Sequence, residues 1–321
     1  MQIVPAHESH LDAITELFIA RVEALRRDIP LVPDTLAQPE AVADRLRGLI
    51  ADAPAWIALE GEVVVGYLAG WIVPDFRSAG RTTAYCPEWG HATAPGREAG
   101  VYRALYHTAS RTWHDMGCEA HALTLLARQP ATEHTWFWSG FGGLVVDAVR
   151  GMTRLSTEPP SSDVTVRRAG KADLDALVAL EAEHARHYAE PPTLMCAYHG
   201  KDRDALETLL AASEERYWLA LDGEEPAAFV CFGQEHGGAD LLAGPSTASI
   251  HGAYTRPAYR GQRLMPALID AALATFAEEG VQRCTVDFEC VNGAAAAFWP
   301  RYFEPVCLSV MRIPERGPEP A

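Results

Sequence analysis

The sequence predicts a mixed α/β fold that is built twice. Three observations favour it: helical and strand-like hydrophobic patterns alternate, strands outnumber helices, and the second half of the chain repeats the first. At 321 residues the chain is also longer than one hydrophobic core usually supports. We therefore expect two α/β (mixed α+β) domains, each with a mixed, mostly antiparallel sheet flanked by helices.

The repeat is visible at three places that follow in the same order. Residues 3–14 match residues 166–177, and residues 56–62 match residues 218–224. A third set, Arg97, Ala104, Leu105 and Gly117, returns 163 positions later as Arg260, Ala267, Leu268 and Gly280. Because the period is as long as a domain, each copy is predicted to be a whole domain.

Turn-forming residues and prolines mark the predicted boundaries. The predicted segments are a first domain at 1–157, a linker at 158–163, a second domain at 164–314 and a tail at 315–321. Each domain is expected to begin with a short apolar strand.

Two helices and two strands are predicted to follow in each copy. The helices are expected at 11–26 and 39–51 in the first copy, and at 174–188 and 204–216 in the second. The strands are expected at 56–59, 63–69, 217–221 and 227–232. The second copy continues with a strand at 248–255, a long helix at 261–279, a strand at 284–288, a short helix at 294–302 and a strand at 306–312. In the long helix the predicted buried face comprises Met265, Ile269, Ala272 and Phe276.

Composition excludes several classes of protein. A net charge of −16 disfavours nucleic acid and anionic membranes as partners, since both need basic surface. The apolar stretch 56–73 is interrupted by acidic residues and glycines, so it is too polar to span a bilayer. Seven dispersed cysteines and an N-terminus without a basic-then-apolar pattern lead us to expect a cytoplasmic protein.

The segment 249–268 carries the strongest chemical signal. An apolar strand ends in an arginine and a proline, a tight turn follows, and a helix begins at once. A helix N-terminus offers free backbone N–H groups and the positive end of the dipole, so it favours phosphate. Basic side chains are concentrated there in an otherwise acidic protein: Arg256, Arg260, Arg263 and His251.

This segment resembles the coenzyme A-binding signature of the GNAT family of N-acetyltransferases. The run 285–306, with Asn292, resembles that family's closing strand, asparagine, short helix and final strand, and residues 167–177 resemble its usual start. The resemblance implies two tandem GNAT-like acyl-CoA N-acyltransferase domains. It also implies acetyl-CoA as cosubstrate and direct attack on its thioester by the primary amine of a small molecule.

The turn departs from the family pattern in both copies. That pattern is arginine or glutamine, two free positions, glycine, one free position, then glycine or alanine. The second copy puts Arg263 and Met265 at the two small positions, whereas the first keeps Gly100 but places Glu98 beside the expected diphosphate. We assign catalysis to the second copy and regard the first as degenerate.

The resemblance also assigns residues to the cosubstrate. A backbone N–H near Tyr254 or Thr255 is expected to stabilise the oxyanion that develops on the thioester. The expected contacts in the second copy are Ala253, Tyr254, Thr255, Arg260, Gly261, Gln262, Arg263, Leu264, Met265, Asn292 and Trp299, and those in the first are Arg97, Gly100, Val101 and Tyr102.

Catalytic groups are harder to assign. The family's proton-donating tyrosine is replaced by Trp299, so Tyr302, three residues later, is our substitute for the acid. Candidates for the base are Asp287 and Glu289, which share a strand face, and His251 on the neighbouring strand. The alternative is that the two carboxylates simply face solvent.

Two other functions remain open. The chain is alternatively a non-catalytic acyl-CoA-binding or sensor protein, or an enzyme whose catalysis is confined to the first copy. Glu181, His184 and His187 recur at a spacing of three and could bind a metal, but we interpret them as a solvated helix face and predict no metal site.

The acceptor pocket is expected at residues 189–201 and 234–245, whose sequences do not identify the amine. The acidic composition is compatible with a cationic amine. A two-copy chain is expected to be a monomer, in which the copies form a pseudo-dimer, or a homodimer.

Overall fold

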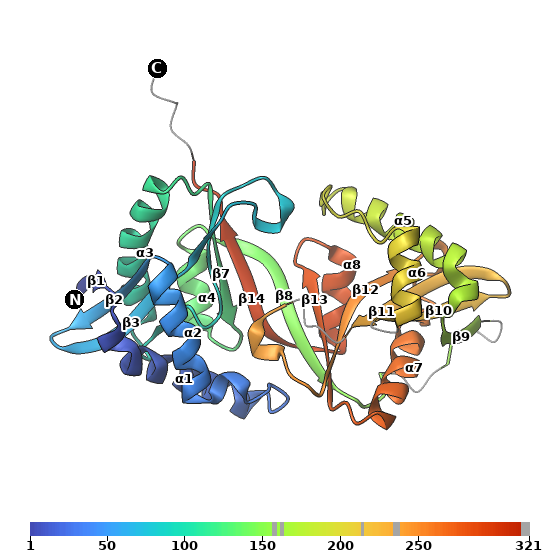
Figure 1. The fold of residues 1–321 in the computed structure, drawn as a ribbon, viewed down its shortest axis with the longest axis horizontal. Coiled ribbons are helices and arrows are strands. Elements are labelled where there is room, and N and C mark those ends of the chain that lie inside the picture. Colours follow the sequence, from blue (N-terminus) through green and yellow to red (C-terminus); the bar gives the residue numbers. More distant parts are fainter. Residues whose placement is uncertain (156–158, 161–163, 213–214, 234–237, 316–321) are drawn as a thin grey trace, which may run out of the picture. The chain divides into compact units, whose positions relative to one another are not determined.

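The computed structural model describes residues 1–155, 159–160, 164–212, 215–233 and 238–315 (Figure 1). The first repeat contains β1 (Gln2–Pro5), α1 (Leu11–Asp28), α2 (Pro39–Asp52), β2 (Ala55–Glu60), β3 (Val63–Ala69), β4 (Trp71–Val73), β5 (Thr83–Cys86), β6 (His91–Thr93), α3 (Glu98–Asp115), β7 (Ala120–Leu126), α4 (Pro130–Phe137) and β8 (Gly142–Gly151). The second contains β9 (Val164–Arg168), α5 (Leu174–Ala189), α6 (Arg203–Ala212), β10 (Arg216–Asp222), β11 (Glu225–Gly233), β12 (Thr247–Thr255), α7 (Leu264–Glu278), β13 (Arg283–Glu289), α8 (Gly293–Phe298) and β14 (Glu304–Arg312).

These elements form two compact units. Unit 1 comprises Met1–Val146, Ala239–Leu241 and Pro305–Ala321, and unit 2 comprises Asp147–Gly238 and Leu242–Glu304. Within unit 1, β14 pairs antiparallel with β7, and the Leu241 N–H donates to the Glu88 carboxylate at 2.7 Å. Unit 1 therefore includes two segments from the second repeat.

The predicted domain boundaries stay a prediction. Most of the predicted linker and of the predicted tail lies outside the described residues. Among the described helices, none combines the length and the apolarity needed to cross a lipid bilayer.

Unit 1 contains two groups of strands. The order β1-β2-β3-β6 is antiparallel throughout. The order β4-β5-β7-β14 has one parallel pair, β5 with β7. Helix α3 packs on β2 and β3 through a core that includes Trp56, Val101, Leu105 and Trp113.

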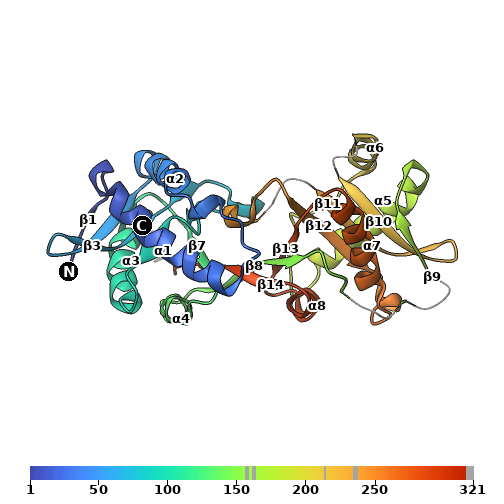
Figure 2. The same ribbon diagram turned by 90° about the horizontal axis from the view of Figure 1, so that it is seen from below.

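Unit 2 repeats this plan with one run of strands. The order β9-β10-β11-β12 is antiparallel, and β13 joins β12 in parallel; both views show β12 between β11 and β13 (Figures 1 and 2). The predicted mixed, mostly antiparallel α/β fold is confirmed in both repeats.

Alternation along β10 explains how the helices of unit 2 cover this sheet. Tyr217 and Leu219 point to the side where α5 supplies Leu177 and α6 supplies Leu206. Trp218 points to the opposite side and packs against Phe276 of α7, at 5.6 Å between ring centroids. Successive strand residues face opposite sides, so each helical layer meets its own set of side chains.

Three helices differ from the prediction. The short helix predicted at 294–302 is α-helical only over Gly293–Phe298, as α8, and continues as a 3-10 turn over Trp299–Arg301. The helix predicted at 204–216 ends as α6 at Ala212, and Arg216 instead begins β10. The long helix begins at Leu264 rather than at 261, because Gly261 (φ 79°) and Arg263 (φ 63°) adopt left-handed conformations that a helix does not accept. Its predicted buried face is buried except at Met265, which is half-buried.

Candidate functional site

Strand β12 loses one of its two neighbouring strands halfway along its length. Its first half pairs in parallel with β13, and this ladder ends where Ile250 faces Val286. On its other side β12 stays paired with β11, but the register shifts between Cys231 and Phe232 and skips His251. His251 therefore lies in a β-bulge, a feature that bends a strand and redirects a side chain. The last residues of β12 extend beyond the ladder to β13, which leaves an edge of their main chain for a ligand.

The bulge brings His251 to a carboxylate that the motif does not contain. His251 Nδ1 lies 3.1 Å from Oε1 of Glu215, which immediately precedes β10. Room for the imidazole comes from Gly233, where an added Cβ would lie 2.1 Å from His251 Cε1. When Nδ1 of a histidine donates to a carboxylate, Nε2 keeps its lone pair and can accept a proton.

Glu215 is the centre of this arrangement. Its second oxygen accepts the Lys201 ammonium at 2.9 Å and the Cys231 thiol at 3.2 Å. Burial by itself raises the pKa of the Glu215 carboxyl, but the hydrogen bonds from His251 and Lys201 and the Lys201 charge outweigh it and lower the pKa to about 2. Glu215 is therefore ionised at any pH at which the protein is expected to work.

A second carboxylate lies nearby under α5. Glu181 is 1% exposed, and its Oε1 accepts the Tyr217 hydroxyl at 2.8 Å. His184, 4% exposed, contacts the Tyr198 hydroxyl through Nδ1 at 3.2 Å. We name Glu181, His184, Tyr198, Lys201, Glu215, Tyr217, Cys231 and His251 the polar cluster.

The interpretation of 181, 184 and 187 as a solvated helix face was wrong for two of the three residues. Glu181 and His184 continue the buried stripe that begins with Leu177 and Leu180, whereas His187 is half-buried. Polar residues at positions i+4 and i+7 of an apolar stripe are the signal that would have identified them. Within the described part of the chain, no three His, Cys, Asp or Glu side chains are arranged to hold a metal ion.

The turn before α7 is open to solvent. Arg260, Gly261, Gln262 and Arg263 are all exposed, and a Cβ added at Gly261 would meet nothing within 4 Å. Arg263 keeps the left-handed backbone conformation for which a glycine is favoured. The N–H groups of the first turn of α7 have no acceptor inside the helix, so the turn can receive an anion.

The expected contacts around this turn differ in their exposure. Leu264 is buried and Met265 is half-buried, whereas the four residues before them are exposed. Ala253 and Thr255 are half-buried on β12, whereas the Tyr254 ring is buried against His184, at 5.7 Å between ring centroids. Tyr254 can therefore contribute its main chain to the opening and not its ring.

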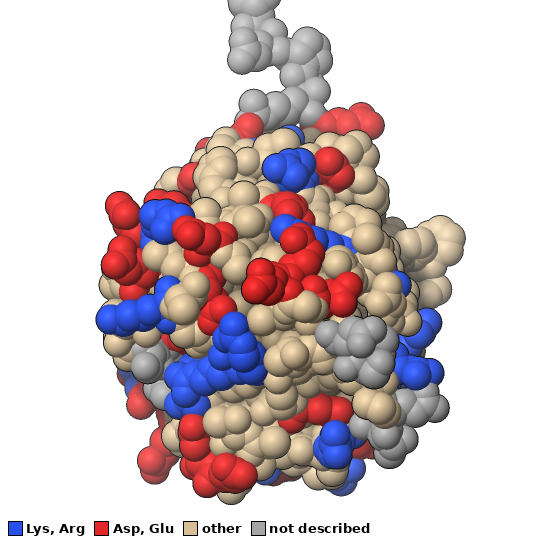
Figure 3. Space-filling model, turned by 90° about the vertical axis from the view of Figure 1, so that its right-hand side faces the viewer, with Lys and Arg blue, Asp and Glu red and all other residues tan. Residues whose placement is uncertain are grey.

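Two of the four basic side chains predicted at the turn are bound to carboxylates. Arg256 binds the carboxylates of Glu183 and Glu225, and His251 is bound to Glu215. Arg260 and Arg263 are exposed at the turn itself, and Arg260 Nε donates to the Thr255 carbonyl oxygen at 3.2 Å. On the face shown in Figure 3, acidic and basic side chains form small neighbouring groups.

The closing segment of unit 2 is mostly structural in this conformation. Asn292 is buried and caps α8 by accepting the Ala295 N–H at 3.3 Å. Trp299 is also buried, against the ring of Phe298 at 4.9 Å between centroids. Tyr302 is half-buried, with its ring 5.0 Å from that of Phe298.

The two carboxylates of β13 are in different environments. Asp287 is exposed and Glu289 is buried. The alternative that the two carboxylates simply face solvent therefore applies to Asp287 alone. His251 does lie on the strand beside β13, as expected. The roles of these residues and of Tyr302 stay predictions.

The equivalent turn of unit 1 is occupied by its own side chains. Arg97 forms a bidentate ion pair with Glu60, and the Gly96 N–H donates to the Glu98 carboxylate at 3.1 Å. Gly100 is exposed with open space around it, so steric crowding at the glycine does not close the turn. The acidic groups beside it compete with any phosphate.

The other two residues expected to contact the cosubstrate in the first copy, Val101 and Tyr102, are part of the core of unit 1. Val101 is buried, and the buried Tyr102 hydroxyl is hydrogen-bonded to the Arg21 guanidinium and lies 3.0 Å from His91 Nδ1. Burial, with the Arg21 charge, lowers the pKa of His91 to about 3. His91 is therefore neutral, and the network that fills this interior has no group free to act as a base near pH 7.

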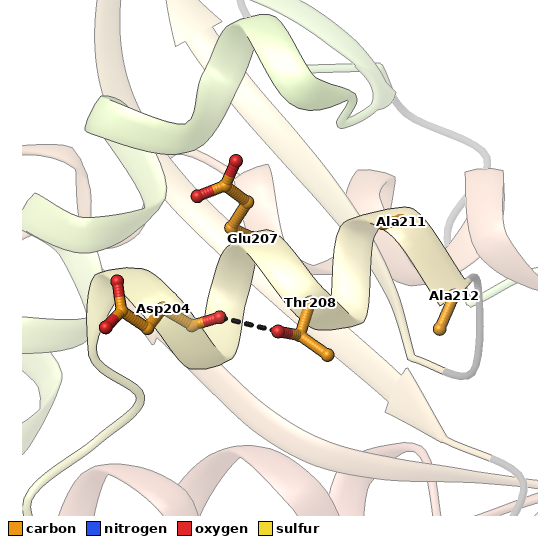
Figure 4. A pocket seen from close by; sticks show the side chains of 5 residues that line it. All are labelled: Asp204, Glu207, Thr208, Ala211 and Ala212. Atoms are coloured by element: carbon orange, nitrogen blue, oxygen red, sulfur yellow. Dashed lines mark hydrogen bonds between the residues drawn. The ribbon is translucent and has the colours of Figure 1, made fainter.

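One further hollow lies on the outside of α6 (Figure 4). Its lining consists of residues from that helix alone, and its one drawn hydrogen bond joins Thr208 to the Asp204 carbonyl within the helix. Polar groups from separate elements do not converge there, so it lacks the character of a ligand site.

Sequence reasoning missed Glu215 and Lys201. Glu215 was placed in a predicted helix, and no motif links it to His251. Lys201 lies within one stretch of the expected acceptor pocket, but four residues of the other stretch, 234–237, lie outside the described residues.

Comparisons with known proteins bear on the family and the fold of the chain. Residues 180–303 match the model of the acetyltransferase (GNAT) family. No curated protein matches the chain. The whole chain is similar to a GCN5-related N-acetyltransferase from Sphaerobacter thermophilus, at 13% identity and a TM-score of 0.55 over 97% of this chain and 95% of that one.

Two other solved structures are similar over nearly the whole chain. One is a GCN5-related glucosamine N-acetyltransferase region of a fungal multi-domain β-N-acetylglucosaminidase, at 14% identity and a TM-score of 0.51, covering 97% of this chain and 38% of that one. The other is a tandem GNAT protein from the clavulanic acid biosynthesis pathway, at 15% identity and a TM-score of 0.49, covering 98% and 99%.

Proposed function

The second half of the chain belongs to the acetyltransferase (GNAT) family and the chain as a whole has the tandem GNAT fold, and from this premise we propose that it transfers the acetyl group of acetyl-CoA to a primary amine of a small molecule. The active site proposed is that of unit 2. The protein is proposed to be a cytoplasmic enzyme without a metal.

One observation carries the proposal. The strand that ends at the open turn before α7 also holds the bulge at which His251 meets Glu215. The proposed diphosphate site and the proposed base thus lie along one strand, on either side of the edge that extends beyond the ladder to β13. A thioester bound along that edge would have a helix N-terminus at one end and an imidazole at the other.

Acetyl-CoA supplies an acyl group on a sulfur leaving group. We expect the main-chain N–H groups of residues 261–264, with the Arg260 and Arg263 side chains, to hold the diphosphate. A main-chain N–H at Tyr254 or Thr255 would donate to the carbonyl oxygen as it becomes an oxyanion. Asn292 and Trp299 are expected to shape the opening from the α8 side.

The proton has a defined route in this proposal. The acceptor arrives as an ammonium, and His251 Nε2 removes its proton directly or through one water. The amine nitrogen then bonds to the carbonyl carbon, the carbon–sulfur bond breaks, and the nitrogen loses its second proton to solvent, from which Tyr302 is reprotonated. Tyr302 returns a proton to the sulfur, while Glu215 is a positioning residue that stabilises the imidazolium.

Other carboxylates are weaker candidates for the base. Glu289 is buried at the end of β13 and Asp287 faces solvent, whereas His251 lies on the bulge itself. The Cys231 thiol is unsuited to nucleophilic chemistry, because burial raises its pKa well above the ordinary value.

The test is amine-dependent release of the coenzyme A thiol, with a panel of primary amines and mass spectrometry of the products. His251→Asn is expected to slow release by about a hundredfold or more, since general base catalysis contributes roughly that factor. His107→Asn, at an exposed position of α3, is the matched control. Binding of acetyl-CoA without release for any amine would favour a sensor and overturn the proposed activity.

A further inference from the structure

The most unusual group in unit 2 is the Glu181 carboxylate. It is 1% exposed, and only one of its two oxygens has a hydrogen-bond partner among the described residues, the Tyr217 hydroxyl at 2.8 Å. Its Oε2 lies 3.9 Å from His184 Nδ1, which is too far for a hydrogen bond. A buried carboxylate oxygen without a donor is costly, so a cation or donor placed there is strongly favoured.

Apart from its two imidazoles, the polar cluster holds two carboxylates, those of Glu181 and Glu215, and a single ammonium, that of Lys201. Lys201 contacts Glu215 at 2.9 Å and lies 5.6 Å from the centroid of the Tyr217 ring. Burial lowers the Lys201 pKa, but neighbouring acidic groups, Glu215 and Glu181 among them, outweigh it and raise the pKa. Lys201 therefore stays charged but neutralises only one carboxylate.

Glu181 faces the same side of the sheet as the proposed base. Its partner Tyr217 is on β10, and Cys231, which contacts Glu215, is on the adjacent β11. Gly252, next to the bulge, is close enough to α5 that an added Cβ would lie 3.9 Å from His184 Cε1. The orphan oxygen and His251 thus both belong to the polar cluster.

We propose that Glu181 binds a second, positively charged amino group of the acceptor while its reacting amine lies at His251. The acceptor class is then a diamine or a sugar with two amino groups. This inference rests on the proposed function and deepens it, because it states which amine reacts. Glu181 keeps one amine charged, and His251 deprotonates the other.

The segment between α5 and α6 covers this site. It supplies Tyr198 and Lys201, and Gly200 packs so closely on α5 that an added Cβ would lie 2.9 Å from the Glu181 carbonyl oxygen. Entry of an acceptor therefore requires this segment to move aside. Lys201 shows that an alkyl chain ending in an ammonium fits beside the Glu215 carboxylate.

The test compares two probes that differ by one charge, 1,4-diaminobutane and n-butylamine. In the wild-type protein we expect the KM for the diamine to be lower by about tenfold or more, as for a charged group paired in a desolvated site. Glu181→Gln should remove this preference and leave the KM for acetyl-CoA unchanged. Glu207→Gln, which deletes an exposed carboxylate of α6, is the matched control and should keep the preference.

A second variant keeps the test decisive should Glu181→Gln fold poorly. Lys201→Met retains the aliphatic volume but leaves both carboxylates without a cation. Binding of 1,4-diaminobutane, measured by calorimetry without acetyl-CoA, should be tighter in this variant than in the wild type. Equal affinity in the two proteins would contradict the proposal, as would an equal KM for both probes in the wild type.

The outcomes separate this inference from the proposed function. Thiol release with n-butylamine as efficient as with the diamine would overturn the role of Glu181 and leave the acetyltransferase standing. Binding of the diamine that depends on Glu181, with no thiol release for any amine, would overturn the acetyltransferase and leave the ammonium site standing.

Discussion

Replacing Glu215 with glutamine tests the centre of the polar cluster. Folding lowers the pKa of this carboxyl from an ordinary 4.5 to about 2. Because each pK unit is worth about 1.4 kcal/mol, the ionised carboxylate contributes roughly 3 kcal/mol of stability near neutral pH. Its side chain is 17% exposed, so solvent screening removes little of this. The expected loss for Glu215→Gln is therefore up to roughly 3 kcal/mol, within the range for breaking a buried ion pair.

The sign of the pH dependence is fixed by the same shift. A carboxyl whose pKa is lowered by folding contributes fully above its unfolded value, and the contribution is lost as the pH falls through the folded value. The stability gap between wild type and Glu215→Gln should thus be largest near pH 7 and smaller by about 1.4 kcal/mol near pH 3.5.

Urea unfolding of Glu215→Gln, Glu207→Gln and the wild type at both pH values measures this gap. Glu207→Gln should stay within about 0.5 kcal/mol of the wild type, as surface substitutions do. The proposed positioning role adds a kinetic readout: the pH profile of thiol release should shift, because the imidazolium loses its counter-ion. A variant as stable as the wild type at pH 7, with an unmoved profile, would refute the reasoning.

Three further predictions concern the turns, the interior of unit 1 and the proposed acid. Gly261→Asp should abolish measurable coenzyme A binding in calorimetry, because it adds a negative charge and a strained φ at the open turn, whereas Gly100→Asp should leave affinity unchanged; the reverse pattern would move the site to unit 1. Wild-type stability should fall on acidification from about pH 7 to about pH 5, because unfolded His91 takes up a proton at its ordinary 6.5 while the folded imidazole, at about 3, does not. His91→Gln should reduce that fall by about 2 kcal/mol in urea unfolding, and an unchanged fall would show that His91 is not its source. Tyr302→Phe should slow thiol release by roughly tenfold or more and flatten the alkaline side of its pH profile; unchanged turnover would remove Tyr302 from the mechanism.

Hydrophobic pattern and repetition were sufficient to predict the fold. The strand predicted at 248–255 is β12, Thr247–Thr255, and the helix predicted at 11–26 is α1, Leu11–Asp28. These elements are long and strongly periodic, so their own residues determine them. The start of α7 was not predictable in the same way, because a left-handed arginine at 263 is a conformation that sequence preference argues against.

The site was predictable only where a motif describes it. The turn at Gly261 and the position of His251 follow from the local pattern of strand, turn and helix. The partner of His251 does not, because Glu215 is 36 positions away and reaches it through the register shift between β11 and β12. A bulge depends on how two strands pair, and a single strand's sequence does not reveal it.

The two repeats use equivalent positions in opposite ways. At the offset of 163 positions that relates them, Arg21 and Tyr102 of unit 1 correspond to His184 and Met265 of unit 2. In unit 1 the guanidinium and the phenol bind each other, so the charged group behind the turn has a partner. In unit 2 the smaller imidazole and the thioether make no such bridge, and the adjoining Glu181 keeps an oxygen without a hydrogen bond.

An unpaired buried polar group is costly, so a ligand that pairs with it is favoured. This asymmetry is the physical reason for our proposal that the chemistry lies in the second repeat, although only the first keeps the family's middle glycine. It also predicts that Arg21→His with Tyr102→Met would destabilise unit 1 without giving it coenzyme A affinity, because Glu60 and Glu98 would still hold the turn. Adding Gly261→Asp to this double variant removes the turn of unit 2, so calorimetry with coenzyme A then reports on unit 1 alone. Measurable coenzyme A binding would show that the interior network, and not the acidic turn, had closed the first repeat.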